Sequence, residues 1–169
     1  MPNRHLADDS VLFELAARVG EALKAQGLML ATAESCTGGW VAEAVTSVAG
    51  SSAWFDCGMA AYSYEAKQAL LRVRPETLME HGAVSRETAL EMVSGALITS
   101  GASLAVAVTG IAGPGGGLPG KPVGTVCFGW ACEKYTQTER VVFAGDRHSV
   151  RTQTAEHALR GLLKFIKQL

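Results

Sequence analysis

The sequence predicts an α/β protein: a three-layer sandwich with a mixed, mostly parallel sheet and helices on both faces. Two short apolar runs, 28–32 and 104–109, are typical of buried strands, and segments with apolar residues at helical spacing alternate with such runs. Glycine-rich turns at 35–39 and 110–117 follow these two strands. Ligands on sheets of this class bind beyond the carboxyl ends of the parallel strands, so we expect both turns at the binding edge.

The expected elements follow from caps, breakers and periodicity. Residues 1–7 are expected to form a loose end, and the first helix is expected to be capped by Asp8, Asp9 or Ser10 and to end at Gly27. The other expected elements, in chain order, are a strand at 28–34, a helix at 40–48, a buried strand at 55–62, helices at 64–73, 75–81 and 86–99, a central strand at 104–109, an antiparallel hairpin of strands 123–132 and 138–143, and a last helix opened by Asp146.

The composition narrows the function classes. The chain has 169 residues, of which 48% are hydrophobic and 18% charged, which fits one well-buried globular domain spanning 1–169. A net charge of −1 without a basic block argues against nucleic-acid binding. No apolar run approaches the length of a membrane span, and the N-terminus has no signal-peptide pattern. Four cysteines without a C-x-x-C pair predict neither a metal site nor a disulfide framework, and hence a cytoplasmic protein.

The turn at Ser35 is the first candidate for chemistry. Ser35 lies where a strand leads into a helix, and Gly38 and Gly39 allow a tight turn and a close approach to a ligand. The first N–H groups of a helix lack intrahelical partners and lie at the positive end of its dipole, which favours an anion or an oxyanion. The alternative is that Ser35 or Thr37 is only an N-cap, and the turn by itself leaves both interpretations open.

Three further groups invite a chemical interpretation. Tyr62 and Lys67 are five residues apart at the end of the second strand and can face one cleft, although most lysines are solvated surface residues. The loop 109–117 can wrap a phosphate or ribose with its N–H groups, or it is simply a flexible surface loop. It is neither a Walker A motif nor a GxGxxG motif before a helix. Arg147 can bind a phosphate or carboxylate, whereas Asp146 beside it is expected to be an N-cap.

Six motifs in order carry a family resemblance: AESCTGG, GSSAWFDCGMAAYSYEAK, HGAVS, TGIAGPGGG, KPVGTV and the GDR that opens the last helix. In this order they resemble the CinA C-terminal domain family, and more closely its stand-alone bacterial nicotinamide-nucleotide amidohydrolases of the PncC type. The resemblance extends from about residue 10 to about residue 165. Some members of the larger family carry a second, N-terminal module. We expect this chain to lack it, because the sequence begins at the first predicted helix.

The resemblance implies a reaction: deamidation of nicotinamide mononucleotide (NMN) to nicotinic acid mononucleotide and ammonia in NAD salvage, without a metal or cofactor, by a homodimer or larger assembly. It places the catalytic serine, lysine and tyrosine on Ser35, Lys67 and Tyr62. Lys67 must be neutral to accept a proton from Ser35, which requires desolvation or a cationic neighbour. The positions expected to bind substrate or its oxyanion are Cys36, Thr37, Gly38, Gly39, Thr109, Gly110, Gly113, Gly115, Gly116 and Arg147.

Departures from the family and rival interpretations stay open at this point. Tyr64 stands where the family pattern has Asn, which leaves the rate and the substrate preference in doubt. Cys36 is a better nucleophile than Ser35 at neutral pH, but neighbours on an extended stretch point opposite ways, so only one can face the cleft. A non-catalytic pyridine-nucleotide-binding or regulatory module is the second alternative. The third is an interaction protein with an oligomer surface formed by Trp40, Trp54 and Phe55.

Overall fold

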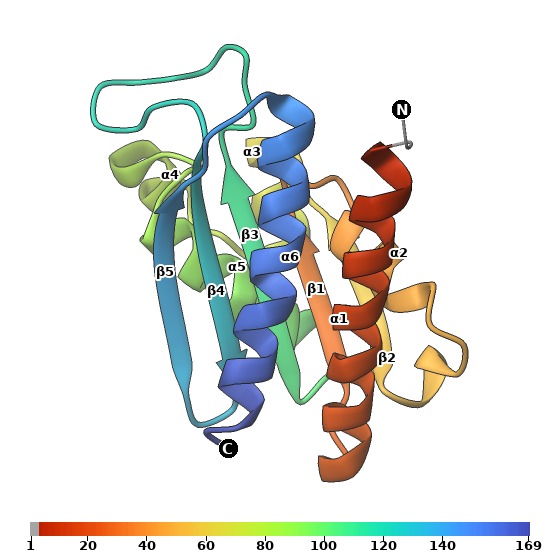
Figure 1. The fold of residues 1–169 in the computed structure, drawn as a ribbon. Coiled ribbons are helices and arrows are strands. Elements are labelled where there is room, and N and C mark those ends of the chain that lie inside the picture. The colour runs from red at the N-terminus through yellow and green to blue at the C-terminus, as the bar shows by residue number, and fades with distance from the viewer. Residues whose placement is uncertain (1–3) are drawn as a thin grey trace.

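The protein forms a five-stranded sheet with helices on both faces (Figure 1). The structure is a computed structural model that describes residues 4–169, with side chains described from Ser10 onward. The strand order is β2-β1-β3-β4-β5. The β1–β2 and β1–β3 pairings are parallel, and the β3–β4 and β4–β5 pairings are antiparallel, which confirms a mixed sheet. The strands are β1 (Leu30–Glu34), β2 (Phe55–Ala60), β3 (Leu104–Gly110), β4 (Thr125–Cys132) and β5 (Thr136–Val142).

Each face of the sheet carries its own core. One face packs the larger side chains of the central strands, such as Leu30, Val106 and Phe128, against α1, α2 and α6. The other face is built on alanines of β1 and β3, on which α5 and its neighbours α3 and α4 lie. The three layers that the sequence predicts are therefore confirmed. The helices are α1 (Arg4–Gln26), α2 (Trp40–Thr46), α3 (Tyr64–Leu71), α4 (Pro75–His81), α5 (Arg86–Thr99) and α6 (Arg147–Ile166).

The carboxyl ends of β1 and β3 lie side by side. β3 is the central strand and is buried from Leu104 to Thr109, as its unbroken apolar sequence predicts. Glu34 pairs with Val108 in register, and the next residue, Ser35, donates its N–H to Val108 O at 3.0 Å. The turn after β1 and the glycine-rich loop after β3 therefore leave the sheet at the same edge, as expected.

Two expectations about the N-terminal half were wrong. The helix α1 already begins at Arg4, so Asp8, Asp9 and Ser10 lie inside it rather than capping it. No glycine or proline interrupts residues 4–10, so nothing in the local sequence stops the helix there. Residues 1–3 of the expected loose end lie outside the described residues. The strand β2 was expected to be buried, but its residues alternate between half-buried and exposed because it forms an edge of the sheet.

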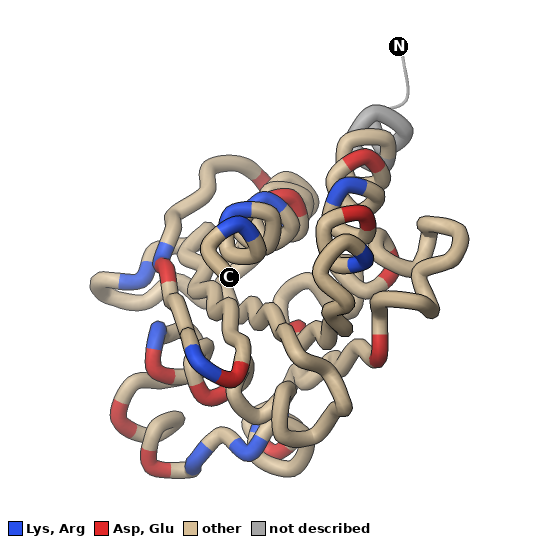
Figure 2. Tube along the Cα trace, turned by 90° about the horizontal axis from the view of Figure 1, so that it is seen from below, with Lys and Arg blue, Asp and Glu red and all other residues tan. Residues whose placement is uncertain are grey.

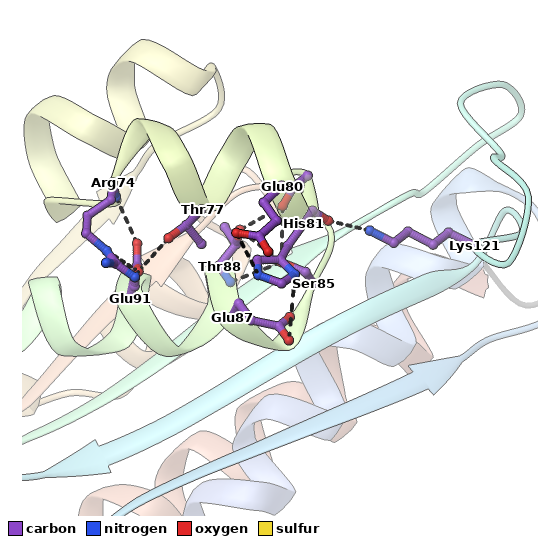
Figure 3. Close-up of polar contacts among 10 residues, drawn as sticks. Arg74, Thr77, Glu80, His81, Ser85, Glu87, Thr88, Glu91 and Lys121 are labelled. Carbon is purple, nitrogen blue, oxygen red and sulfur yellow. Dashed lines mark hydrogen bonds and ion pairs between the residues drawn. The ribbon is translucent and has the colours of Figure 1, made fainter.

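Polar side chains fix the corner between α4 and α5 (Figure 3). Glu91 of α5 accepts hydrogen bonds from the main-chain N–H and Nε of Arg74, both at 2.8 Å, and from Thr77 Oγ1 at 2.7 Å. Ser85 caps α5 by accepting from the N–H of Thr88 at 3.0 Å. These bonds define the start of α5 and its position against α4.

The connection between α4 and α5 is tied to the edge of the sheet that carries the glycine-rich loop. Lys121, from the chain between β3 and β4, donates to His81 O at 2.6 Å, which Figure 3 shows as a link across to α4. Thr109 Oγ1, near the end of β3, donates to Ala83 O at 2.7 Å. The hydroxyl of Thr109, which was expected to bind substrate, is thus engaged with the neighbouring main chain.

Positions of both charge signs are spread along the described chain, as the blue Lys and Arg and the red Asp and Glu positions on the tube in Figure 2 show. Within residues 4–169, no helix has the length and apolar character that crossing a membrane requires.

Candidate active site

Ser35 and Lys67 are in direct contact. Ser35 is the first residue after β1, and Lys67 lies in the first turn of α3, whose start is set by Ser63 accepting from the N–H of Ala66 at 3.0 Å. Lys67 Nζ lies 2.9 Å from Ser35 Oγ. Ser35 is 7% exposed and Lys67 is 1% exposed. The fold therefore brings a serine and a buried lysine together across 32 residues of sequence.

The surroundings of Lys67 favour its neutral form. Besides Ser35, its Nζ donates to two main-chain carbonyls, Ala61 O and Tyr62 O, both at 3.1 Å, so all three acceptors are uncharged. Burial lowers the pKa of Lys67 below its ordinary value. A neutral amine has two N–H donors for the two carbonyls, which leaves its lone pair for the hydroxyl of Ser35. Lys67 Nζ can thus accept the proton of Ser35 without a rearrangement of either side chain.

Glu34 holds the turn that carries Ser35, a role that the sequence analysis missed. Its buried carboxylate accepts four hydrogen bonds, at 2.6–3.1 Å, from Thr37 Oγ1 and from the main-chain N–H groups of Gly39, Val41 and Ala42. Three of these donors are at the N-terminus of α2, which explains how a carboxylate is stable there. The sequence signal that was available is an acidic residue directly before a glycine-rich turn into a helix.

The N-terminus of α2 is consequently not free for a ligand. Gly39 donates to Glu34, and Gly38 donates its N–H to Ser35 O at 3.0 Å. Among the residues that the structure describes, no main-chain carbonyl accepts from the N–H of Cys36 or Thr37, and the N–H of Cys36 contacts only its own thiol. The N–H groups of residues 36–39 were all expected to bind an oxyanion. Only those of Cys36 and Thr37 remain candidates among them.

Arg151 of α6 supports the same turn from the opposite side and was also missed. Its Nε donates to Cys36 O at 3.0 Å and its Nη2 donates to Thr37 O at 2.9 Å. The guanidinium carbon lies 5.2 Å from the centre of the Trp40 ring, a cation–π contact. Arg151 follows Arg147 by four residues, which places the two on one face of a helix. That spacing is the only sequence signal for its location.

Cys36 lies in the core and takes no part in the contact between Ser35 and Lys67. Its side chain is 5% exposed and belongs to the core under α1, α2 and α6. Burial, and then the charge of Glu34, raise the pKa of the Cys36 thiol to about 12. The expectation that Ser35 and Cys36 point to opposite sides is confirmed, and the thiol on the core side stays protonated at neutral pH.

Tyr62 contacts Lys67 through its main chain and Arg147 through its side chain. The Tyr62 side chain is 62% exposed, and its hydroxyl accepts from Arg147 Nη2 at 3.1 Å. Arg147 Nη1 donates to Gly113 O at 2.8 Å, and Asp146 caps α6 as predicted. We call Tyr62, Gly113 and Arg147 the rim. The lysine is held by the carbonyl of Tyr62, whereas the phenol hydroxyl belongs to the rim.

The glycines of the loop 110–117 fall into two groups. A Cβ on Gly110 would lie 2.7 Å from Val126 Cγ2, and one on Gly113 would lie 2.5 Å from Val123 Cγ1. These two glycines are required by close packing. A Cβ on Gly115 would meet no atom within 4 Å, and one on Gly116 would meet only Ile111 at 3.4 Å, although the φ of Gly116 is 88°. The outer glycines leave this part of the loop open to a ligand.

Metal ligands do not gather anywhere in residues 4–169: the structure holds no group of three or more His, Cys, Asp or Glu side chains that could bind a metal ion. The chemistry that the described side chains offer at the turn is that of a serine hydroxyl beside a buried amine.

Comparison with known proteins agrees with the resemblance seen in the sequence. Residues 12–166 match the family described as the CinA C-terminal domain. The chain belongs to this family. The match includes the whole sheet of this CinA-type domain, because β1 to β5 all lie within 12–166.

Relatives and solved structures extend the match over most of the chain. The nicotinamide-nucleotide amidohydrolase PncC of Escherichia coli K12 is 52% identical over 155 residues, which is 91% of this chain and 94% of that protein. PncC of Pseudomonas putida is 52% identical over 152 residues, 89% of this chain and 94% of that protein. The crystal structure of the competence/damage inducible protein CihA from Agrobacterium tumefaciens superposes with a TM-score of 0.89 at 46% identity, covering 91% of this chain and 94% of that one.

Glu34→Gln is expected to destabilise the CinA-type domain and slow its reaction together. A Gln side chain can place its oxygen against only one side of the donor set, so its NH₂ group meets either the N–H of Ala42 or the three donors that now bind Oε2. We expect the free energy of unfolding to fall by about 2–3 kcal/mol, measured by urea denaturation. Glu43→Gln, on the helix α2 whose N-terminus Glu34 holds, is the control, and equal stability of the two variants would contradict this role of Glu34.

Proposed function

We propose that this chain hydrolyses the carboxamide of NMN, giving nicotinic acid mononucleotide and ammonia, and that the reaction serves NAD salvage. The observation that carries the proposal is the 2.9 Å contact between Ser35 Oγ and the Nζ of the buried Lys67. The name of the PncC relatives, at 52% identity, supplies the substrate class.

Acylation begins with attack of Ser35 Oγ on the carboxamide carbon. Lys67 Nζ takes the hydroxyl proton as the C–O bond forms, and the carbonyl oxygen becomes an oxyanion. The N–H groups of Cys36 and Thr37 stabilise that charge. Because the pyridinium ring of NMN is itself a cation, its arrival beside Lys67 further disfavours the protonated amine.

The tetrahedral intermediate then collapses. Lys67 returns the proton to the amide nitrogen, the C–N bond breaks and ammonia leaves, so that an ester joins Ser35 Oγ to the nicotinoyl carbon. A water molecule attacks this ester and gives a proton to Lys67. The C–Oγ bond breaks, and Ser35 regains its proton. Lys67 therefore acts as base and acid in each half of the reaction, and no other proton carrier is needed.

The ribose phosphate is assigned to the rim. Arg147 carries the positive charge there, and its present acceptors, Gly113 O and the Tyr62 hydroxyl, are neutral groups that a phosphate oxygen can replace. Gly115 and Gly116 lie in the open part of the adjoining loop. Tyr64, where the family pattern has Asn, is 47% exposed and lies three residues before Lys67, so we assign to it an influence on substrate preference.

A substrate panel tests the proposed activity. Purified protein in EDTA is incubated with NMN, with nicotinamide riboside and with nicotinamide, and the acid products are separated by chromatography. We expect nicotinic acid mononucleotide from NMN, and slower turnover of the two compounds without a phosphate because they offer no phosphate to Arg147. Equal turnover of free nicotinamide would contradict the assignment of a nucleotide substrate.

The pH profile reports on Lys67. Only the neutral amine accepts the proton of Ser35, so kcat/KM for NMN is expected to rise with pH through the pKa of Lys67 and then to level off. Because burial lowers this pKa, the midpoint of the rise is expected below the ordinary lysine value of about 10.4. Initial rates between pH 5 and pH 10 measure it, and a rate that falls as pH increases from 6 to 9 would contradict a neutral Lys67 as base.

Assembly and location are part of the proposal. We propose a homodimer or larger assembly, in which large apolar side chains such as Met79 (82% exposed) and Ile98 (60% exposed) are covered. The described cysteines are all free thiols, which fits a reducing compartment, and we place the protein in the cytoplasm. Light scattering after size exclusion tests the assembly, and a monomer at micromolar concentration would exclude it.

A non-catalytic pyridine-nucleotide-binding module is the remaining alternative. It would keep the open glycine loop and Arg147 but would not need a buried lysine beside a serine. A rise in melting temperature with NMN, without any acid product, would favour it.

A further inference from the structure

The geometry points to Arg151 as a positioning residue that aims the two N–H groups next to Ser35 at the oxyanion. Arg151 lies on α6, 115 residues from Cys36 and 114 from Thr37, yet it donates to the carbonyls of both. This role rests on the proposed function, because it concerns the oxyanion formed during deamidation. It goes further by assigning the orientation of the donors to a residue that bonds the two carbonyls of the turn and not Ser35 itself.

Arg151 orients the N–H of Thr37 through the peptide unit between Cys36 and Thr37. The C=O of Cys36 and the N–H of Thr37 belong to one planar peptide unit, in which they point in opposite directions when the bond is trans. Arg151 Nε holds the Cys36 oxygen at 3.0 Å on the side of α6. The N–H of Thr37 is thereby directed to the other side of the turn, away from α6.

A second path reaches Cys36 through one more hydrogen bond. Arg151 Nη2 holds the Thr37 oxygen at 2.9 Å, which fixes the plane containing the N–H of Gly38. That N–H donates to Ser35 O at 3.0 Å, and Ser35 O shares a peptide unit with the N–H of Cys36. Both N–H groups beside Ser35 are therefore linked to one guanidinium, with the N–H of Trp40 as a second donor to Thr37 O at 3.3 Å.

The guanidinium is itself well held. Its carbon lies 5.2 Å from the centre of the Trp40 ring, and Trp40 is the first residue of α2. Two parallel donors on a planar group fix direction as well as distance, which a lysine ammonium on a flexible stem does not. On the other side of the turn, Glu34 holds Thr37 Oγ1 and the start of α2. Arg151 and Glu34 thus both fix the turn, and Arg151 is the side chain that bonds the carbonyls of Cys36 and Thr37.

The test compares Arg151→Met and Arg151→Lys with Arg160→Met, a change of the same kind on an exposed part of the same helix. We expect kcat for NMN to fall about 10²-fold in Arg151→Met, as for loss of an oxyanion donor, with KM changed less than about threefold. Arg151→Lys is expected to remain closer to Arg151→Met than to wild type. Added methylguanidinium is expected to restore part of the rate of Arg151→Met and to leave Arg160→Met unaffected.

Inhibitor binding separates positioning from general stability. The aldehyde analogue of NMN can add to Ser35 and place an oxygen at the oxyanion position, whereas the product, nicotinic acid mononucleotide, cannot be attacked in this way. We expect Arg151→Met to lose affinity for the aldehyde by about the same factor as kcat and to keep its affinity for the product. Equal losses for both compounds, or an unchanged kcat in a folded variant, would overturn the inference. Absence of NMN turnover in wild type would instead refute the proposed function.

Discussion

Ser35→Ala is expected to reduce kcat/KM for NMN by about 10⁴-fold or more, the largest effect of any single substitution in this chain. The substitution removes the oxygen that forms the acyl bond, and nothing else in contact with Lys67 can replace it: its other two partners are the carbonyls of Ala61 and Tyr62. The binding of NMN, measured by calorimetry, is expected to change little, because Ser35 is one small group in the site.

The control is Ser52→Ala, the same chemical change at an exposed serine, which is expected to keep wild-type rates. The result also decides between Ser35 and Cys36. Full activity in Ser35→Ala, abolished by a thiol reagent, would move the nucleophile to Cys36. The structure argues against that outcome, since burial and Glu34 raise the pKa of the Cys36 thiol to about 12 and its side chain lies in the core.

Lys67→Arg and Lys67→Met are expected to lose activity to a similar extent, by about 10³-fold or more in kcat. Arginine keeps a positive charge and several donors, but its pKa stays above about 12, so it cannot take the proton of Ser35. Methionine keeps much of the volume of the side chain and removes the base altogether. Steady-state rates of ammonia release measure both, and circular dichroism checks that the variants are folded.

The comparison of these two variants identifies what Lys67 contributes. If Lys67 served only as a fixed positive charge near the substrate, Lys67→Arg would retain most of the rate and Lys67→Met would not. That pattern would contradict a neutral lysine as general base. Lys164→Met, on α6 and away from the turn, is the matched control and is expected to behave as wild type.

The contact between Ser35 and Lys67 could be predicted from the sequence for a physical reason. Each residue follows a strand closely, the two strands are parallel neighbours, and their carboxyl ends therefore meet at one edge of the sheet. The helix α5 was predicted with its exact bounds because Ser85 is a strong N-cap and the periodic pattern ends at Thr99.

Contacts that depend on the direction of a side chain could not be predicted from the sequence. The four hydrogen bonds of Glu34 require its side chain to fold forward over the turn, and no spacing rule states this. Arg151 reaches the turn only because α6 packs beside α2, a contact between elements more than a hundred residues apart. The exposure of β2 likewise depends on its place at the edge of the sheet, which periodicity does not report.

Ammonia release from NMN in EDTA, by wild type beside Ser35→Ala and Lys67→Arg, tests the central claim most directly. We predict that wild type releases one ammonia for each nicotinic acid mononucleotide formed and that both variants, though folded, release almost none. Turnover by both variants would contradict the Ser35–Lys67 mechanism. A wild type that binds NMN without releasing ammonia would contradict the proposed activity altogether, and Tyr64→Asn would then show whether this one departure from the family pattern is the cause.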